Sequence, residues 1–292
     1  MGILIAAILT TIVAIVVIGA LIRRLSARED RSVLILAFFF ALPLQPLAFY
    51  FIRLPLHELL TKWIGAGALL TAISLFYAPV TEEAAKWLAL GVPSIKKALK
   101  PENAIAIALA VGLGFGIGEL WFIAERLTHS PQLLGLPFYA FTGFLTERLM
   151  VCFLHGSFIA LFFKHYAEGK SIGAAALFGV ALHFALNFPI YLSGINLFGL
   201  GARIWGPLLV IYVSLFTLAM FAFVNRLSSG KARFGFLGDA TCPECHQVYL
   251  RSFFALNLLT RRYERCPHCR HWHLAPVRQP SRDATGDNGE KA

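Results

Sequence analysis

The sequence predicts an all-α polytopic membrane protein of about seven transmembrane helices, followed by a small cytoplasmic module. Three observations predict this class. Of the 292 residues, 58% are hydrophobic, and the mean hydropathy is +0.68. Only 14% are charged, whereas an ordinary soluble domain has about a quarter. Four of the five cysteines form two CxxC pairs near the C-terminus. The composition therefore excludes a disordered protein and an ordinary soluble enzyme.

Apolar runs of about 20 residues, enough to cross about 30 Å of hydrocarbon, mark the expected spans. The third run is long enough for one and a half spans, and Pro79 near its middle predicts a kink or a break. We expect it to remain a single crossing. The seven segments are 3–22, 33–52, 65–93, 103–125, 138–163, 171–191 and 204–225.

The basic residues predict the orientation of the chain, because cytoplasmic loops of membrane proteins are rich in Lys and Arg. With the N-terminus outside, the outer loops hold four such residues: Arg53, Lys62, Arg126 and Arg203. The inner segments hold twelve: Arg23, Arg24, Arg28, Arg31, Lys96, Lys97, Lys100, Lys164, Lys170, Arg226, Lys231 and Arg233. This asymmetry accounts for much of the net charge of +10 and predicts a multi-pass protein of the cell membrane with a cytoplasmic C-terminus. The membrane domain is predicted over 1–226.

The cytoplasmic part divides into a linker (227–241), a metal-binding module (242–275) and a disordered tail (276–292). Two CxxC pairs twenty residues apart can place four thiolates around structural Zn²⁺, so the module resembles a zinc ribbon. Two disulfides are the alternative, which a reducing cytosol disfavours. The module is expected to bind a cytoplasmic protein rather than nucleic acid, and its arginines to form a solvated basic face. The expected zinc ligands are Cys242, Cys245, Cys266 and Cys269.

Carboxylates inside the expected spans carry most of the functional information. Glu82, Glu83 and Glu119 would each cost about 3 kcal/mol if ionised at mid-bilayer, or about 10 kcal/mol together. That total rivals the stability of a typical domain, so we expect these groups to pair with one another or to have a function. Lys86 follows Glu82 and Glu83 at i+4 and i+3, which allows an ion pair on one helix face.

Two histidines of later spans join this set. Glu82, Glu119, His155 and His183 all lie within about two helical turns of their segment midpoints, which allows one shared polar cavity. Asn187 follows His183 by one helical turn. Alternate glycines, at 112, 114, 116 and 118, precede Glu119 and would let a neighbouring helix approach it closely.

Taken together, these residues resemble a known family. Glu82-Glu83-Ala84-Ala85-Lys86 resembles the EExxK motif of the PrsW family of intramembrane proteases, and Phe115-x-x-x-Glu119 resembles its FxxxE motif. His155 and His183 resemble the two later membrane histidines of that family. The pattern is more distantly similar to type II CAAX prenyl endopeptidases, whose HxxxN matches His183 to Asn187. Glu119 and the earlier position of Lys86 depart from that second family. The resemblance covers 78–187 and excludes the cytoplasmic module.

The resemblance implies an intramembrane endopeptidase that cleaves membrane-embedded or membrane-anchored proteins. A carboxylate of the Glu82/Glu83 pair would be the general base on a water molecule. Glu119 would hold that water or act as the acid. His155, His183 and Asn187 would polarise the scissile carbonyl and stabilise the oxyanion. A metal version, with three of Glu82, Glu119, His155 and His183 on Zn²⁺, stays open behind the metal-free one.

Two other functional classes stay open at this point. One is a non-catalytic scaffold or receptor of the same fold that acts through its zinc ribbon. The other is a proton- or ion-coupled transporter that uses the same carboxylates. No internal repeat is visible in the sequence, which counts weakly against a transporter.

Overall fold

The structure is a computed structural model that describes residues 1–228, 239–251 and 255–277. The chain forms two compact units, Met1–Arg233 and Phe234–Ala292. The boundary between them falls inside the predicted linker 227–241. Most of that linker (229–238) and most of the predicted tail 276–292 (278–292) lie outside the described residues.

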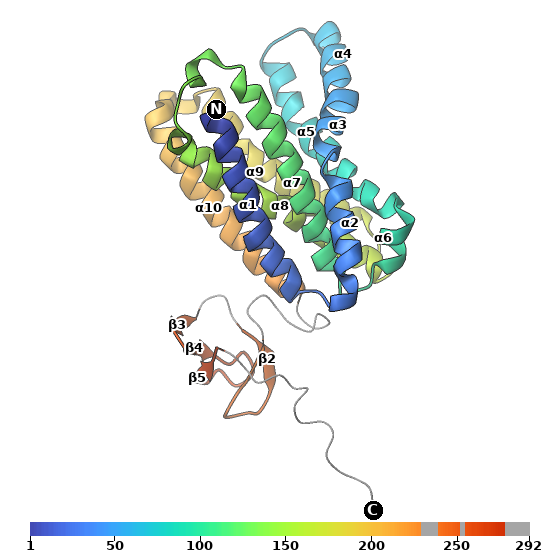
Figure 1. The fold of residues 1–292 in the computed structure, drawn as a ribbon, viewed down its shortest axis with the longest axis vertical. Coiled ribbons are helices and arrows are strands. Elements are labelled where there is room, and N and C mark those ends of the chain that lie inside the picture. The colour runs from blue at the N-terminus through green and yellow to red at the C-terminus, as the bar shows by residue number, and fades with distance from the viewer. Residues whose placement is uncertain (229–238, 252–254, 278–292) are drawn as a thin grey trace, which may run out of the picture. The chain divides into compact units, whose positions relative to one another are not determined.

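The first unit is a bundle of helices (Figure 1). In chain order its helices are α1 (Gly2–Arg24), α2 (Arg31–Ala41), α3 (Leu44–Ala48), α4 (Leu54–Ile64), α5 (Ala68–Trp87), α6 (Pro93–Ala98), α7 (Ala104–Thr128), α8 (Thr142–Ala167), α9 (Gly173–Gly194) and α10 (Gly201–Leu227). A π-helical turn, Phe49–Arg53, joins α3 to α4, and short 3₁₀ turns lie in several other connections.

Six helical segments of the described residues are long and apolar enough to cross a membrane. The predicted number of seven is therefore not confirmed. The third predicted segment, 65–93, makes the difference: its helix α5 carries Glu82, Glu83 and Lys86 in its last turns, which lower its mean hydropathy. Although α5 is not among the six candidate spans, it leads from the end of α4 back along the bundle to α6 (Figure 1). The helix also continues through Pro79 without the predicted break.

The second predicted segment, 33–52, ends too early. The continuous helical stretch runs from Arg28 to Ile64, and Arg53 lies within it rather than in an outer loop. The predicted segment ended before Arg53 because a run of apolar residues is interrupted by any charged side chain. The sequence does not reveal the carboxylate that neutralises this arginine. That carboxylate belongs to Glu82, whose Oε1 lies 2.5 Å from an Arg53 guanidinium nitrogen.

Helix α7 is the most buried of the candidate spans and packs against α1, α2 and α8. Its alternate glycines explain how. A Cβ on Gly112 would lie 1.9 Å from the backbone nitrogen of Gly156 on α8, and one on Gly114 would lie 2.1 Å from the carbonyl oxygen of Phe38 on α2. One turn later on α7, a Cβ on Gly116 would meet Cys152 of α8, and one on Gly118 would meet the carbonyl oxygen of Leu42, the C-cap of α2. The expected close approach is thus confirmed, and it brings Glu119 of α7 beside α8.

Large apolar side chains cover the outer faces of the bundle. Val16 of α1, Leu177 of α9 and Val210 of α10 are each more than 60% exposed. Such surfaces are too apolar for water and match the lipid-facing side of a membrane bundle. At one end of the bundle, Asn103 donates to the Asp30 carboxylate (2.9 Å) and Lys164 donates to the carbonyl of Leu227 (2.5 Å).

The second unit contains five short strands in the described residues. An antiparallel pair, β1 (Asp239–Thr241) and β2 (Val248–Leu250), flanks the first CxxC turn. A three-stranded antiparallel sheet, β3 (Leu256–Leu258), β4 (Arg261–Arg265) and β5 (Trp272–Pro276), carries the second CxxC turn between β4 and β5. The core is small, and it consists mainly of Ala240, Cys242, Tyr249, Cys266 and Ala275.

Candidate active site

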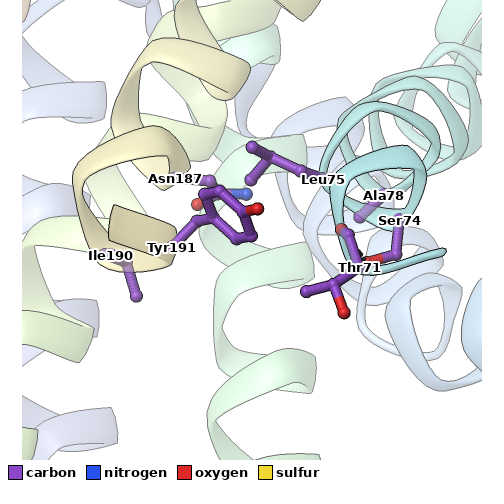
Figure 2. A pocket seen from close by; sticks show the side chains of 7 residues that line it. All are labelled: Thr71, Ser74, Leu75, Ala78, Asn187, Ile190 and Tyr191. Atoms are coloured by element: carbon purple, nitrogen blue, oxygen red, sulfur yellow. Dashed lines mark hydrogen bonds between the residues drawn. The ribbon is translucent and has the colours of Figure 1, made fainter. Parts of the chain in front are cut away.

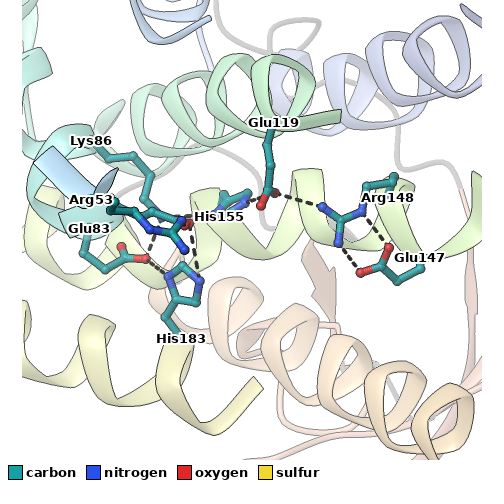
Figure 3. Close-up of polar contacts among 9 residues, drawn as sticks. Arg53, Glu83, Lys86, Glu119, Glu147, Arg148, His155 and His183 are labelled. Carbon is teal, nitrogen blue, oxygen red and sulfur yellow. Dashed lines mark hydrogen bonds and ion pairs between the residues drawn. The ribbon is translucent and has the colours of Figure 1, made fainter. Parts of the chain in front are cut away.

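Four helices bring the predicted polar residues of the bundle together (Figure 3). Helix α5 contributes Glu82 and Glu83, α7 contributes Glu119, α8 contributes His155, and α9 contributes His183. Of these, Glu82, Glu83, His155 and His183 are buried, and the side chain of Glu119 is 15% exposed. The residues are far apart in sequence, so the cluster is a product of helix packing.

Glu83 and Lys86 form the innermost ion pair. The Lys86 Nζ donates to Glu83 Oε1 at 2.6 Å, and both side chains are fully buried. The same oxygen lies 2.6 Å from His183 Nδ1. The ammonium also lies over the ring of Phe115, 5.1 Å from its centroid, which gives the phenylalanine of the FxxxE-like motif a direct contact with the charge. Glu83 therefore fixes both Lys86 and the ring of His183.

His155 bridges Lys86 and Glu119. Its Nδ1 lies 3.2 Å from Lys86 Nζ, and its Nε2 lies 3.0 Å from Glu119 Oε2. A lysine ammonium can only donate and a carboxylate can only accept, so these partners assign Nδ1 as the acceptor and Nε2–H as the donor. With that assignment His155 is neutral and both of its nitrogens are engaged.

Glu119 is held from the opposite side by Arg148, which stands seven residues before His155 on α8. The guanidinium of Arg148 lies 3.1 Å from Glu119 Oε2 and also pairs with Glu147. The sequence analysis did not place Glu147 and Arg148 in the site, yet both belong to this network. The spacing of seven residues between Arg148 and His155, which puts them on one helix face, was the available signal.

Glu82 and Glu83 each have one buried oxygen without a hydrogen-bond partner among the described residues, but only Glu82 lines a cavity. The Oε1 of Glu82 accepts from Arg53, but its Oε2 is buried and has no hydrogen-bond partner among the described residues. His183 Nε2 lies 3.6 Å from that oxygen. This separation is too long for a hydrogen bond and too short to hold a water molecule between the two atoms, but a water molecule beside them could contact both.

A cavity of about 160 Å³ lies beside this oxygen. Its polar lining consists of Arg53, Glu82, Glu119, Glu147, Arg148, His155, His183 and Asn187. Neither Glu83 nor Lys86 is among its lining residues. They pair with each other, and Glu83 contacts His183 through the Nδ1 atom of its ring. Asn187 lies on the cavity wall, and its amide makes no hydrogen bond among the described residues.

A second hollow, of about 250 Å³, lies between α5 and α9 and shares Ala78, Asn187 and Ile190 with the cavity (Figure 2). Thr71, Ser74 and Tyr191 add hydroxyl groups to its wall. Pro79 of α5 lacks an amide hydrogen, so the carbonyl of Leu75 in this hollow loses its usual helical donor. The hollow thus offers hydrogen-bond acceptors and donors next to the cavity.

The charges of the cluster nearly balance. Three basic groups, on Arg53, Lys86 and Arg148, face four carboxylates, on Glu82, Glu83, Glu119 and Glu147. With both histidines neutral, one negative charge is left over. One additional proton makes the cluster neutral, which favours a site that takes up and releases a single proton in a low-dielectric surrounding.

Two groups of side chains among the described residues have the donor atoms of a metal site. The first is the predicted set Cys242, Cys245, Cys266 and Cys269, whose sulfurs lie within 4.8 Å of one another. The pairs Cys242–Cys269 and Cys245–Cys266 are 3.5 and 3.7 Å apart, close to the about 3.8 Å expected around Zn²⁺ with Zn–S bonds of about 2.3 Å. All four thiols are free, so the disulfide alternative is not realised.

The local backbone explains why the thiols converge. In each CxxC turn the residue four positions after the first cysteine donates its amide to that cysteine's carbonyl, at 3.0 Å, and has a positive φ. These residues are His246 and Arg270, so the two knuckles have the same construction. Burial opposes ionisation of the Cys266 thiol, but hydrogen bonds from the backbone amides of Cys269 and His268 lower its pKa to about 6. The thiolate is the form that binds metal.

The second group is Glu82, His155 and His183, which also lie within 4.8 Å of one another. His183 fits a metal ligand, because Glu83 accepts at its Nδ1 and leaves Nε2 toward the cavity. His155 fits poorly, because Lys86 and Glu119 engage both of its nitrogens. A cation on His155 would also face the Lys86 ammonium.

Comparison of the chain with protein-family models, with curated proteins and with solved structures gives no match.

Arg53 is the member of the site that sequence reasoning missed altogether. It comes from the π-helical turn between α3 and α4, and such turns often occur at functional sites. The residues around Arg53 do not predict that its partner lies on α5, 29 residues later.

Proposed function

We propose that this protein is an intramembrane endopeptidase of the type that its resemblance to the PrsW family implies. Its substrates would be membrane-embedded or membrane-anchored proteins. The observation that carries the proposal is the unengaged Oε2 of Glu82, buried beside a polar cavity and facing His183 Nε2 across 3.6 Å.

Glu82 is the general base in this mechanism. A water molecule in the cavity, in contact with Glu82 Oε2 and His183 Nε2, loses a proton to the carboxylate as its oxygen attacks the scissile carbonyl. A C–O bond forms, the C–N bond breaks, and the proton passes from Glu82 to the leaving amine. Glu83 does not take part in the proton transfer. It accepts from His183 Nδ1 and so keeps the ring oriented, which makes it a positioning residue.

The developing oxyanion needs donors on the cavity wall. Asn187 has an amide without a partner among the described residues, and Arg148 presents a guanidinium that Glu119 and Glu147 hold in place. The neutral His155 donates to Glu119 and completes this rigid set. Donors fixed before the reaction stabilise the charge without reorganisation at the moment of reaction.

The hollow between α5 and α9 is the proposed entrance for the substrate (Figure 2). It adjoins the cavity at Ala78 and Asn187, and both helices carry exposed apolar side chains such as Phe76 and Leu177. A peptide segment in an extended conformation needs partners for its backbone. The hydroxyls of Thr71 and Ser74 and the carbonyl of Leu75 provide such partners.

The proposed membrane arrangement has seven crossings, with α5 as the one that composition alone does not identify. Its polar residues are neutralised by Arg53, Lys86 and His183, so the helix can lie within the bilayer. Seven crossings put the two termini on opposite sides of the membrane. The excess of Lys and Arg in the inner segments then favours a cytoplasmic C-terminus, where the four-cysteine module would hold structural zinc.

A metallopeptidase is the second candidate, favoured by the convergence of Glu82, His155 and His183. Bound Zn²⁺ would supply an activated water molecule. In that case Glu83 would orient His183, and Glu119 would have to give up its bond to His155 Nε2. The engaged nitrogens of His155 are the reason why the metal-free mechanism is the first candidate.

A comparison of new protein termini in membranes tests the proposal. Cells would express the wild type, Glu82→Gln, or Glu58→Gln at matched levels. Glu58 is an exposed carboxylate of α4, so Glu58→Gln controls for the substitution itself. We expect termini that appear with the wild type and Glu58→Gln and disappear with Glu82→Gln. Identical profiles for all three, with folded protein in each, would instead favour the scaffold or the transporter.

A further inference from the structure

The outward face of the sheet β3–β4–β5 is a mixed apolar and basic surface. Along β4 the side chains of Arg261, Tyr263 and Arg265 are exposed, whereas Arg262 and Glu264 point inward. Their partners in register on the neighbouring strands are all exposed: Leu256, Leu258, Trp272, Leu274 and Pro276. We name the set of Leu256, Leu258, Arg261, Tyr263, Arg265, Trp272 and Leu274 the outer sheet face.

This face is more apolar than a solvated basic surface, which is what the sequence predicted. Its four large apolar residues are each between 46% and 62% exposed, and Tyr263 stacks on Trp272 with ring centroids 5.2 Å apart. No acidic side chain belongs to the face. Exposed apolar area of this kind on so small a unit indicates an interaction surface.

The turn between β3 and β4 adds a second, independent observation. Leu259 at this turn is 97% exposed and has a φ of 49°. That left-handed conformation favours glycine or asparagine, and a fully exposed leucine gains nothing from water there. A leucine at an exposed position with a left-handed backbone indicates a partner that is itself apolar.

The short connection between the two units keeps one possible partner, the membrane, always within reach of the module. Helix α10 ends at Leu227 and β1 begins at Asp239, so eleven residues separate them. Even a fully extended connection of this length reaches only about 40 Å. The module is therefore tethered close to the membrane that the bundle occupies, and tethering makes even weak binding effective.

We propose that the outer sheet face and Leu259 bind the anionic surface of this membrane. Trp and Tyr favour the boundary between headgroups and acyl chains, leucines enter the apolar layer, and arginines contact lipid phosphates. The absence of acid from the face removes the repulsion that an anionic surface would otherwise cause. The inference concerns the cytoplasmic module and holds whether or not the bundle is a peptidase.

The test uses the full-length protein in vesicles of phosphatidylcholine alone or with about one-third phosphatidylglycerol, a fraction typical of strongly anionic membranes. Brominated lipids quench tryptophans that touch acyl chains. The signal of Trp272 is the part of the emission that Trp272→Phe removes, which separates it from the four other tryptophans.

We expect bromolipid to quench the Trp272 signal in anionic vesicles and much less in neutral ones. Arg261→Gln/Arg265→Gln and Leu259→Ser should each reduce this quenching at least twofold, and high salt should act like the arginine variant. Arg23→Gln/Arg28→Gln, which removes two exposed charges from the bundle, should leave it unchanged. Each variant must retain zinc, as a check that the module is folded.

Two results would overturn the proposal. One is a Trp272 signal that bromolipid leaves unquenched in both kinds of vesicle. The other is an unquenched signal that shifts on addition of a single-stranded oligouridine, which would make the face a nucleic-acid platform.

Discussion

At the scale of single residues, Glu83 and Glu82 are neighbours in sequence with different surroundings. Glu83 is fully buried, bonded to Lys86 and His183 through one oxygen, and absent from the cavity lining. Glu82 pairs with Arg53 and lines the cavity. Substitution of Glu83 should therefore lower the stability of the bundle, whereas substitution of Glu82 should lower the rate of catalysis.

Glu83→Gln should destabilise the bundle, because it leaves the Lys86 ammonium buried without its carboxylate. Loss of one partner of a buried pair costs about 3–5 kcal/mol. The double variant Glu83→Gln/Lys86→Met removes both charges and should recover most of that loss. Thermal unfolding in a fixed detergent measures both effects. A double variant no more stable than Glu83→Gln would show that the pair is not the cause.

The sequence predicted five of the residues that line the cavity, because polar side chains within apolar spans are expected to face the interior of a bundle. They are Glu82, Glu119, His155, His183 and Asn187. Glu82, Glu119, His155 and His183 were expected to share a cavity, and they line one. Their partners were harder to foresee. Arg53 belongs to a helix that meets α5 only through tertiary packing, and the exact pairing of Glu119 with Arg148 depends on the depth at which α7 and α8 cross.

At the scale of elements, the contact between α7 and α8 positions Glu119 against His155. It depends on backbone contact at Gly112, which no side chain can enter without moving a helix. Alternate glycines in the sequence were sufficient to predict this close approach. They could not identify which neighbour each glycine faces.

Gly112→Ala should lower stability by about 1–3 kcal/mol, the usual cost of overpacking, and reduce activity through the displaced Glu119–His155 pair. Gly19→Ala on α1 is the matched control, because a Cβ there meets no atom within 4 Å. Thermal unfolding of both variants gives the comparison. Equal stability of the two would contradict close packing of α7 on α8.

The four-cysteine module should hold one zinc ion per chain, which elemental analysis of purified protein measures. Cys266→Ser should abolish or greatly reduce this content, because it removes one of four ligands. Cys152→Ser, at a buried position of α8 outside the set, should retain the zinc. Two zinc ions per wild-type chain, one of them lost in His183→Ala, would favour the metallopeptidase over the metal-free mechanism.

At the scale of the whole molecule, the membrane topology depends on α5. Hydropathy is a sum over residues, so it penalises the three charges of α5 even though each has an oppositely charged partner in the bundle. The sequence analysis included this segment because its apolar run is long, and the composition of the finished helix excludes it from the candidate spans. Chemical labelling can decide between these alternatives.

Cysteines introduced one at a time at position 62, before α5, and at position 97, after it, should lie on opposite sides of the membrane. A membrane-impermeant maleimide added to intact cells should label Lys62→Cys and not Lys97→Cys, with wild-type labelling subtracted. Permeabilised cells provide the control for accessibility of the second site. Labelling of both positions in intact cells would place them on one side and exclude α5 as a crossing.

The most direct test of the central claim is hydrolysis by purified protein in liposomes made in H₂¹⁸O. The substrate is the membrane protein that the comparison of termini identifies. The account predicts that wild-type protein generates a new C-terminus carrying one ¹⁸O atom, and that Glu82→Gln slows cleavage by about 10²–10⁴-fold. Cleavage by Glu82→Gln at the wild-type rate would contradict the assignment of Glu82 as the base.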